Sequence, residues 1–174
     1  ERGMEIEAVK KLLQDKKRKD VAYEKILTSM CTYPHEIAAY AHEMFLEANL
    51  GDSGLFQGAK EMEEEAVQMI GKLLGNENAF GYISTGGTES NIQAIHAIRN
   101  RKRRDGLKAM NIIVPETAHF SFDKIGDLLS IEVRKAALDD ELRVDVNSVD
   151  ELIDDKTICV VGIAGTTEFG QIDP

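Results

Sequence analysis

Tyr82-Ile83-Ser84-Thr85-Gly86-Gly87-Thr88-Glu89-Ser90-Asn91 is a small, polar, glycine-rich stretch between two apolar segments of the chain. Before it, residues 79–83 are apolar and aromatic, which predicts a short buried strand. After it, isoleucines recur at helical spacing up to the basic run Arg99–Arg104, which predicts a helix. The stretch is therefore expected to be a tight turn from a strand into a helix.

Such a turn is suited to an anion. Two adjacent glycines let the backbone turn tightly and bring its N–H groups close to a ligand. The free N–H groups and the positive dipole end of the following helix then favour a phosphate. The stretch has neither the Gly-Lys-Ser/Thr of a Walker A loop nor the GxGxxG pattern. The alternative is a plain glycine-rich turn capped by Thr88, with Ser90 and Asn91 as ordinary first-turn residues.

The composition is that of an ordinary globular protein. The chain has 174 residues, which suits one domain or a large part of one, and 43% of them are hydrophobic and 30% charged. Its net charge of −10 argues against nucleic acid as the main partner, because a phosphate backbone needs a basic face. The basic runs Lys16–Lys19 and Arg99–Arg104 are expected to be solvated helix ends, where cations suit the helix dipole.

The sequence gives no sign of a membrane partner. No apolar run reaches the roughly 18 residues of a membrane span, and no signal peptide is visible. Cys31 and Cys159 lie far apart and form no CxxC motif, so reduced thiols are expected. These features together predict a cytoplasmic protein.

Strands and helices alternate along the chain, which predicts an α/β fold with a mainly parallel sheet. The expected strands, besides residues 79–83, are residues 111–115, 131–133 and 157–164. The expected helices cover residues 1–19, 35–48, about 62–74, the segment up to Leu129, and 147–154. The second of them is followed by a turn at residues 49–54, for which the alternative to a functional loop is a plain helix-ending loop with Gly51 as the cap. The segment 111–115 is apolar throughout and should be buried on both faces of the sheet.

Three loops are expected to leave the carboxyl ends of three strands, where open α/β sheets bind ligands. These loops are Ser84–Asn91, Thr117–Ser121 and Gly165–Gly170. They offer phosphate donors, an aromatic ring that can carry a proton, and hydroxyl groups. The combination is more specific for a ligand site than any one of the loops.

These segments resemble a known family. Ser-Thr-Gly-Gly-Thr-Glu-Ser-Asn from residue 84, Thr-Ala-His-Phe-Ser-Phe-Asp-Lys from 117 and Gly-Thr-Thr-Glu-Phe-Gly-Gln-Ile-Asp-Pro from 165 are similar, in order and spacing, to motifs of pyridoxal-phosphate-dependent group II amino-acid decarboxylases. Asn-Leu-Gly-Asp-x-Gly-Leu-Phe from residue 49 and Ser-Met-Cys from 29 fit the archaeal L-tyrosine/L-aspartate decarboxylases in particular.

The resemblance implies a fold-type I architecture and a homodimer with shared active sites, with no nucleic-acid or membrane partner. It implies that residues 1–50 form an N-terminal helical segment and that residues 51–174 are the N-terminal part of the large, cofactor-binding domain. The implied reaction converts L-tyrosine to tyramine, L-aspartate to β-alanine, or both, with release of carbon dioxide; such products feed methanofuran and coenzyme A biosynthesis. The choice between the two substrates stays open.

The resemblance also implies the roles of three cofactor-binding elements. Gly87 and Thr88 match the positions that hold the cofactor phosphate. His119 matches the catalytic histidine that stacks on the pyridine ring, and Thr167 matches the hydroxyl that bonds the cofactor's phenolic oxygen. The alternatives are a loop-end histidine without a ligand and a threonine that satisfies a turn.

The resemblance also implies two substrate-binding positions. Asn49 and Asp52 match residues that approach the substrate side chain in the related glutamate enzymes. No metal ligand is implied.

Two groups that the chemistry requires have no match in the chain. A pyridoxal-phosphate decarboxylase needs a lysine for the Schiff base and a carboxylate on the pyridine nitrogen. In the family both follow the third loop, and the chain stops at Pro174. The sequence is therefore expected to be the N-terminal half of an enzyme about twice as long. Two alternatives remain, namely a carbon–carbon lyase similar to sphingosine-phosphate lyase, and a non-catalytic binding module.

Overall fold

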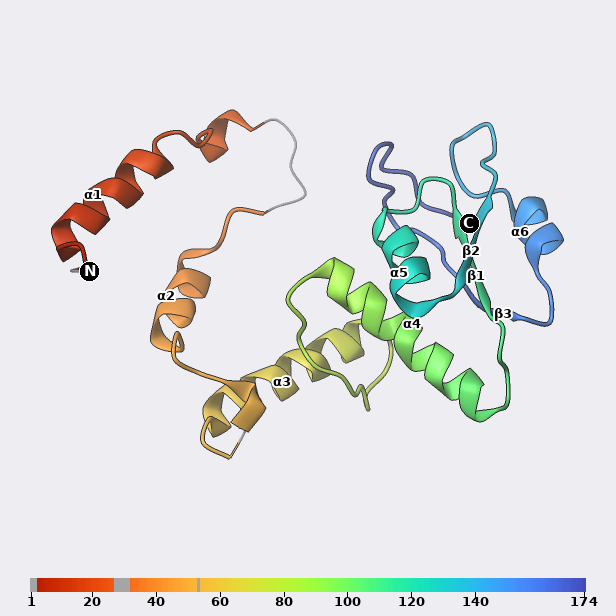
Figure 1. Ribbon diagram of the computed structural model, residues 1–174, viewed down its shortest axis with the longest axis horizontal. Coiled ribbons are helices and arrows are strands. Elements are labelled where there is room, and N and C mark those ends of the chain that lie inside the picture. The colour runs from red at the N-terminus through yellow and green to blue at the C-terminus, as the bar shows by residue number, and fades with distance from the viewer. Residues whose placement is uncertain (1–2, 27–31, 53) are drawn as a thin grey trace. The chain divides into compact units, whose positions relative to one another are not determined.

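The computed structural model describes residues 3–26, 32–52 and 54–174 (Figure 1). The chain divides into two compact units, Glu1–Ala79 and Phe80–Pro174. The division near residue 50 that the family resemblance implies concerns the whole protein and stays a prediction. The Ser-Met-Cys motif, which includes Cys31, lies outside the described residues.

The first unit is helical. Its helices are α1 (Ile6–Lys17), α2 (Glu36–Met44) and α3 (Gln57–Leu73), with single 3-10 turns η1 (Tyr23–Lys25) and η2 (Leu50–Asp52). Helices were expected in all three places, but α2 ends earlier than residue 48. Gly51 lies within η2 and does not cap α2, so the alternative of a plain helix-ending loop capped by Gly51 is wrong. The reason is local, because the side chain of Asn49 accepts a hydrogen bond from the backbone N–H of Gly51 at 2.8 Å and forms its own turn.

The first unit has little core of its own. Helix α1 carries an apolar stripe, but all four of its residues, Ile6, Val9, Leu12 and Leu13, are exposed. Among the described residues of this unit, only Gly71 is buried. A side chain at Gly71 would meet the carbonyl oxygen of Asn76 at 2.7 Å, so glycine lets the chain fold back over the end of α3. The helices of this unit therefore leave apolar surface uncovered.

The second unit is an α/β layer structure. Its elements are α4 (Gly87–Arg104), β1 (Asn111–Pro115), α5 (Ser121–Leu129), β2 (Glu132–Ala136), α6 (Val146–Leu152) and β3 (Thr157–Val160). The strands are all parallel in the order β2-β1-β3, so β1 is central. This confirms the α/β class and the parallel sheet.

The two faces of β1 pack against different helices, as Figure 1 shows. Ile112 and Val114 face α4 and α5, and Ile113 faces the side covered by α6. The core on the α4 and α5 side consists of Ile95, Met110, Ile112, Val114, Phe122, Ile125, Leu129 and Ile131. The core on the α6 side consists of Ile113, Ala136, Val144 and Val149. The expected burial of β1 on both faces is therefore confirmed.

The strand expected at residues 79–83 is absent from the described structure. Residues 79–84 have no regular secondary structure, and Phe80 is fully exposed. A strand needs a neighbouring backbone with which to pair, and β1, β2 and β3 pair only with one another. The prediction failed because apolar composition alone supplies no pairing partner.

The boundaries of two other elements shifted. β2 begins one residue later than expected and runs to Ala136, because Ser130 ends α5 in a left-handed conformation and Ile131 is still part of the turn. β3 ends at Val160 and not at residue 164, because the chain then turns into a separate bridge between Ala164 and Ile172. The basic runs lie at the ends of α1 and α4, as expected, and their basic residues are exposed apart from Arg99. Arg99 is half-buried and donates to the carbonyl oxygen of Leu129 at 2.9 Å, so the expectation of a solvated residue was wrong there.

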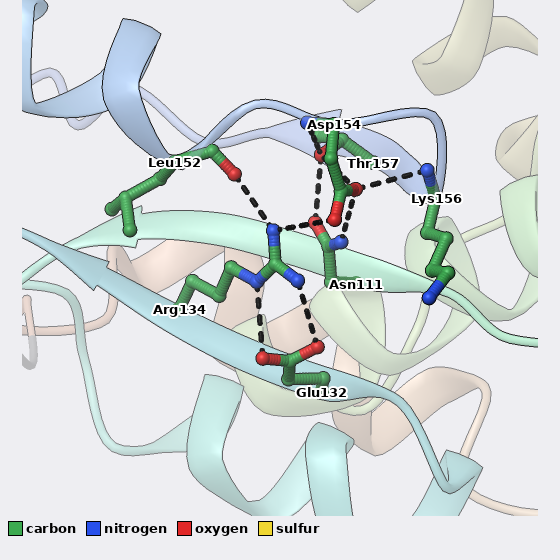
Figure 2. A network of polar contacts seen from close by, with 7 residues as sticks. All are labelled: Asn111, Glu132, Arg134, Leu152, Asp154, Lys156 and Thr157. Atoms are coloured by element: carbon green, nitrogen blue, oxygen red, sulfur yellow. Dashed lines mark hydrogen bonds and ion pairs between the residues drawn. The ribbon is translucent and has the colours of Figure 1, made fainter.

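A polar network fastens the amino ends of the strands (Figure 2). Asn111, the first residue of β1, is fully buried, donates to Asp154 at 2.8 Å and accepts from the hydroxyl of Thr157 at 2.8 Å. Arg134 of β2 reaches Asp154 at 2.9 Å and is also bonded to Glu132. The amide of Asn111, followed by the backbone N–H of Lys156 and then Arg134, holds the pKa of the Asp154 carboxyl well below its usual range. This network ties all three strands at the edge opposite the three expected ligand loops.

Candidate functional site

The glycine loop leads directly into α4. Gly86 is the residue that caps α4, and its φ of 154° and ψ of 176° lie in a region that is essentially restricted to glycine. The first backbone bond of the helix runs from the N–H of Ser90 to the carbonyl oxygen of Gly86 at 3.0 Å. The N–H groups of Gly87 and Thr88 precede that bond and have no partner within the helix. No side chain caps this helix start, so the interpretation of Thr88 as a cap was wrong.

The polar side chains of the loop bond to one another and leave those N–H groups open. The hydroxyls of Ser84 and Ser90 lie 2.7 Å apart. The carboxylate of Glu89 accepts from both the hydroxyl and the backbone N–H of Thr85, the latter at 2.9 Å. These two bonds, the hydroxyl bond first, lower the pKa of Glu89 below its ordinary value. Glu89, the acidic residue in the first turn of α4, is therefore hydrogen-bonded to Thr85.

Neither the backbone conformation nor the packing at position 87 requires a glycine. Unlike Gly86, it has no positive φ, and a Cβ built on it would meet nothing within 4 Å in the described part of the chain. Alanine would be a better helix former at this position. A glycine here therefore fits a ligand that approaches the backbone closely, as a phosphate does at a helix N-terminus.

His119 lies in the loop between β1 and α5, after the carboxyl end of the central strand. Its Nδ1 accepts a hydrogen bond from the backbone N–H of Ser121 at 3.2 Å. In a neutral imidazole the other nitrogen, Nε2, then carries the proton. One side of the ring is against the ring of Phe120, with centroids 4.1 Å apart and planes tilted by 38°. His119 is half-buried and offers a donor N–H together with an aromatic face.

The structure brings the His119 loop to the start of α4. Nδ2 of Asn91, in the second turn of α4, donates to Oγ of Ser121 at 3.1 Å. Ile92, next to Asn91, and Ala118, next to His119, pack against the same core. The first two expected ligand loops therefore meet at one edge of the second unit.

The third loop follows β3, the neighbour of β1, and folds back on itself. Thr166 is 3% exposed, and its hydroxyl accepts from the backbone N–H of Gln171 at 3.0 Å. Thr167 is exposed, and its hydroxyl forms no hydrogen bond with another described residue. The carboxylate of Asp173 fixes the returning chain by accepting from the N–H groups of Ile163 and Val144. The hydroxyl of Thr166 therefore supplies the hydrogen bond within this turn, and the hydroxyl of Thr167 is free to bind a ligand.

A buried hydroxyl near His119 has no partner. Oγ1 of Thr117 is inaccessible to solvent and forms no hydrogen bond with the described residues. A buried unpaired hydroxyl is costly, so such a group needs an explanation, and a partner from outside the described residues is one. Together with the open N–H groups of α4 and the chemistry of His119, it fits a polar cofactor at this edge of the sheet.

Asn49 and Asp52 belong to the first unit. Both lie in the turn around η2, where the backbone N–H of Asp52 donates to the carbonyl oxygen of Asn49 at 3.3 Å. The side chain of Asn49 is engaged with Gly51, and Asp52 is exposed. Their approach to a substrate stays a prediction.

Three contributors to the site were not recognised from the sequence. Asn91 and Ser121 are expected only as the last residues of two of the ligand loops, and Phe120 only as a neighbour of His119, with no role of their own. The sequence contains one weak signal for the contact between Asn91 and Ser121. An Asn and a Ser lie near the starts of two successive helices, 30 residues apart. No helix within the described ranges is long and apolar enough to cross a bilayer.

No family model matches the chain. Among curated proteins, it is 58% identical over its whole length to a probable L-tyrosine/L-aspartate decarboxylase of Methanothrix thermoacetophila, of which it covers 45%. It is 49% identical over its whole length to one of Methanosarcina barkeri, covering 48% of that protein. Over 91% of its length it is 51% identical to a probable L-aspartate decarboxylase of Archaeoglobus fulgidus, covering 42% of it. The chain thus spans about half the length of the curated relatives that it matches.

Solved structures share the fold. The whole chain matches a sphingosine-1-phosphate lyase of Burkholderia pseudomallei with a TM-score of 0.88 and 31% identity, covering 44% of that chain. Over 99% of its length it matches a glutamate decarboxylase of Lactobacillus brevis with a TM-score of 0.87 and 25% identity, covering 42% of it. The fold is therefore that of the pyridoxal-phosphate-dependent decarboxylases and lyases.

Proposed function

Since the chain is homologous over its whole length to the N-terminal half of the archaeal L-tyrosine/L-aspartate decarboxylases, we propose that the whole protein is a pyridoxal-phosphate-dependent amino-acid decarboxylase. The proposed substrates are L-tyrosine, L-aspartate or both, and the products are the corresponding amine and carbon dioxide. The observation that carries the cofactor assignment is the start of α4, where Gly87 has no conformational reason to be glycine and the loop's own acceptors are paired elsewhere.

In this proposal the start of α4 holds the cofactor phosphate. The backbone N–H groups of Gly87 and Thr88 and the hydroxyl of Thr88 donate to its oxygens. Glu89 stays on Thr85, so its negative charge is held by two donors within the loop. Hydrogen bonds to a charged acceptor are the strong ones, and the helix dipole adds to them.

His119 packs against the cofactor ring with the face that Phe120 does not cover. Its Nε2–H is the donor that faces the reacting carboxylate of the substrate, because Nδ1 is occupied by the backbone of Ser121. The hydroxyl of Thr167 bonds the cofactor's phenolic oxygen. When bound, the pyridoxal group supplies an electron-withdrawing ring that accepts the electron pair left by departing carbon dioxide.

The remaining parts of the proposal concern the whole protein. Asn49 and Asp52 contact the side chain of the substrate. The lysine and the carboxylate that the cofactor requires belong to the part of the protein that corresponds to the other half of its relatives. A homodimer in the cytoplasm is proposed, and the exposed apolar stripe of α1 supports an assembly that would cover it.

A second candidate is a carbon–carbon lyase, favoured by the match to the Burkholderia pseudomallei lyase. The higher identity to proteins named as decarboxylases supports the first candidate. The discriminating experiment uses the whole protein loaded with pyridoxal phosphate. Release of carbon dioxide and of tyramine or β-alanine is measured with L-tyrosine and with L-aspartate, and aldehyde release is measured with a phosphorylated long-chain amino alcohol. Decarboxylation of either amino acid is the expected result; cleavage of the amino alcohol alone would overturn the proposal.

A further inference from the structure

A chain of two hydrogen bonds connects α4 to the imidazole of His119. The amide of Asn91 donates to Oγ of Ser121 at 3.1 Å, and the backbone N–H of Ser121 donates to Nδ1 of His119 at 3.2 Å. Ser121 is fully buried, so its position is fixed by packing as well as by these bonds. The link joins segments that are 30 residues apart in sequence.

Asn91 also has a defined place relative to the phosphate-binding end of α4. It follows Thr88 by three residues, so the two lie on the same face of the helix, one turn apart. Their separation along the axis is about 4.5 Å by helix geometry. One rigid element thus carries both a proposed phosphate ligand and the residue that holds the His119 loop.

We propose that Asn91 and Ser121 are positioning residues for His119: Asn91 fixes Ser121, and the backbone N–H of Ser121 fixes Nδ1, so that Nε2 carries the proton and points to the reacting group. This inference deepens the proposed function and rests on the role assigned there to His119. The hydrogen bond made by one ring nitrogen sets the state of the other, so losing the link releases both the orientation and the tautomer of the ring.

The test uses the whole protein and three variants. Asn91→Leu removes the amide at similar volume, and Ser121→Ala removes the hydroxyl while keeping the backbone N–H. The double variant combines them. Asn100→Leu is the matched control, since Asn100 is also a half-buried α4 residue whose amide bonds a histidine, His96, at 3.0 Å.

The first readout needs neither cofactor nor activity. In the ¹⁵N-labelled protein, the Nδ1 chemical shift of His119 and its coupling to the amide nitrogen of Ser121 report the hydrogen bond directly, with signals assigned by comparison with His119→Phe. We expect the coupling in the unmodified protein and in Asn100→Leu, and its loss or clear weakening in Asn91→Leu and Ser121→Ala. Retention of the coupling in both variants would overturn the proposal.

The second readout separates turnover from binding. Loss of the hydrogen-bond partners that orient metal-bound histidines typically costs about 10–100-fold in activity. We expect an effect of similar size here, so kcat should fall roughly tenfold or more in each single variant. Because the two residues act as one link, the double variant should lose about as much as either single variant and not the product of the two losses. The apparent dissociation constant of pyridoxal phosphate should change by less than about threefold, since no phosphate donor is removed.

The outcomes distinguish the two proposals. If the unmodified protein decarboxylates an amino acid but the variants keep both the coupling and kcat, the positioning role is wrong and the function stands. If the variants lose the coupling but the unmodified protein has no decarboxylase activity, the link exists and the proposed function fails. Equal losses of kcat in Asn100→Leu would show that any damage to α4 suffices and would also reject the positioning role.

Discussion

The amide of Asn111 and the carboxylate of Asp154 are joined by a hydrogen bond of 2.8 Å at the amino end of the central strand. Asn111 is fully buried, and Thr157 donates to the other side of the same amide. A buried amide with both ends engaged is satisfied, whereas the same groups are costly to leave unpaired.

The first prediction concerns that amide. Asn111→Leu should lower the free energy of unfolding by about 1–3 kcal/mol, because it leaves the partners of the amide without it in a buried setting. Urea unfolding of the whole protein measures the change. Asn147→Leu is the control, because Asn147 is exposed and its side chain bonds only its neighbour Asp145 among the described residues. An unchanged midpoint for Asn111→Leu would mean that the network does not stabilise the sheet.

The second prediction concerns acid. The folded state depresses the pKa of Asp154, so this group stabilises the fold above its unfolded pKa of about 3.9, and the contribution is lost as the pH falls from there through the folded pKa. Asp154→Asn should therefore be less stable than the unmodified protein at neutral pH, and the difference should shrink below about pH 4. Denaturant unfolding at a series of pH values measures it. A difference that stays constant with pH would contradict the assignment.

The third prediction contrasts the two adjacent glycines. Gly86→Ala should destabilise the fold by about 1–3 kcal/mol, because its backbone conformation excludes a side chain. Gly87→Ala should leave the stability unchanged or raise it by up to about 1 kcal/mol, since it places a better helix former in a helix. The same substitution should weaken pyridoxal phosphate binding about tenfold, equivalent to about 1.4 kcal/mol, because the methyl group obstructs the phosphate. Thermal unfolding and cofactor titration of both variants measure this, and unaltered cofactor affinity in Gly87→Ala would place the phosphate elsewhere.

The fourth prediction contrasts two adjacent threonines. Thr166→Val removes the acceptor for the backbone N–H of Gln171 and should cost about 1 kcal/mol of stability. Thr167→Val should change stability by less than about 0.5 kcal/mol, since the residue is exposed. In the cofactor-loaded protein, Thr167→Val should shift the absorbance band of the bound pyridoxal group, which senses its phenolic oxygen. If Thr166→Val shifted the band and Thr167→Val did not, the roles of the two threonines would have to be exchanged.

The fifth prediction concerns His119. His119→Phe keeps a flat ring and should retain cofactor binding, but it removes the donor at Nε2, and turnover should fall by at least about a hundredfold. His119→Ala should lose both cofactor affinity and turnover. His42→Phe, on the exposed face of α2, serves as the control. If His119→Phe had wild-type turnover, His119 would serve only to stack on the cofactor ring, and another group would have to donate the proton.

The local features of this fold could be predicted from the sequence because they depend on short patterns. The apolar run of β1 and the spacing of Ile92, Ile95 and Ile98 both indicate burial without reference to distant residues. Residues 79–83 look similar by composition, but whether they pair depends on a neighbouring strand. The sequence pattern therefore predicts the central strand β1 correctly, whereas the strand that it predicts at residues 79–83 is wrong.

The neighbourhood of two of the expected ligand loops could be predicted from the sequence, whereas the roles of their residues stay predictions. The order of the three loops indicated one edge of a parallel sheet, and the structure brings the first two together through Asn91 and Ser121. That hydrogen bond could not be predicted, because it depends on how α4 and α5 pack. Which of Thr166 and Thr167 is buried likewise depends on the position to which the chain brings Gln171. The residues next to the two threonines in the sequence do not determine that position.

The polar network at the amino ends of the strands has a consequence for how this protein can change. Asn111 and its partners connect the strands at one end of β1, and His119 follows the other end of this strand. Substitutions near His119 therefore leave these hydrogen bonds in place. In a directed-evolution experiment, libraries restricted to the exposed residues of the loops after β1 and β3 should retain a high fraction of folded members. Substitutions for heat tolerance can be sought around Arg134 and Asp154 with little effect on the proposed reaction.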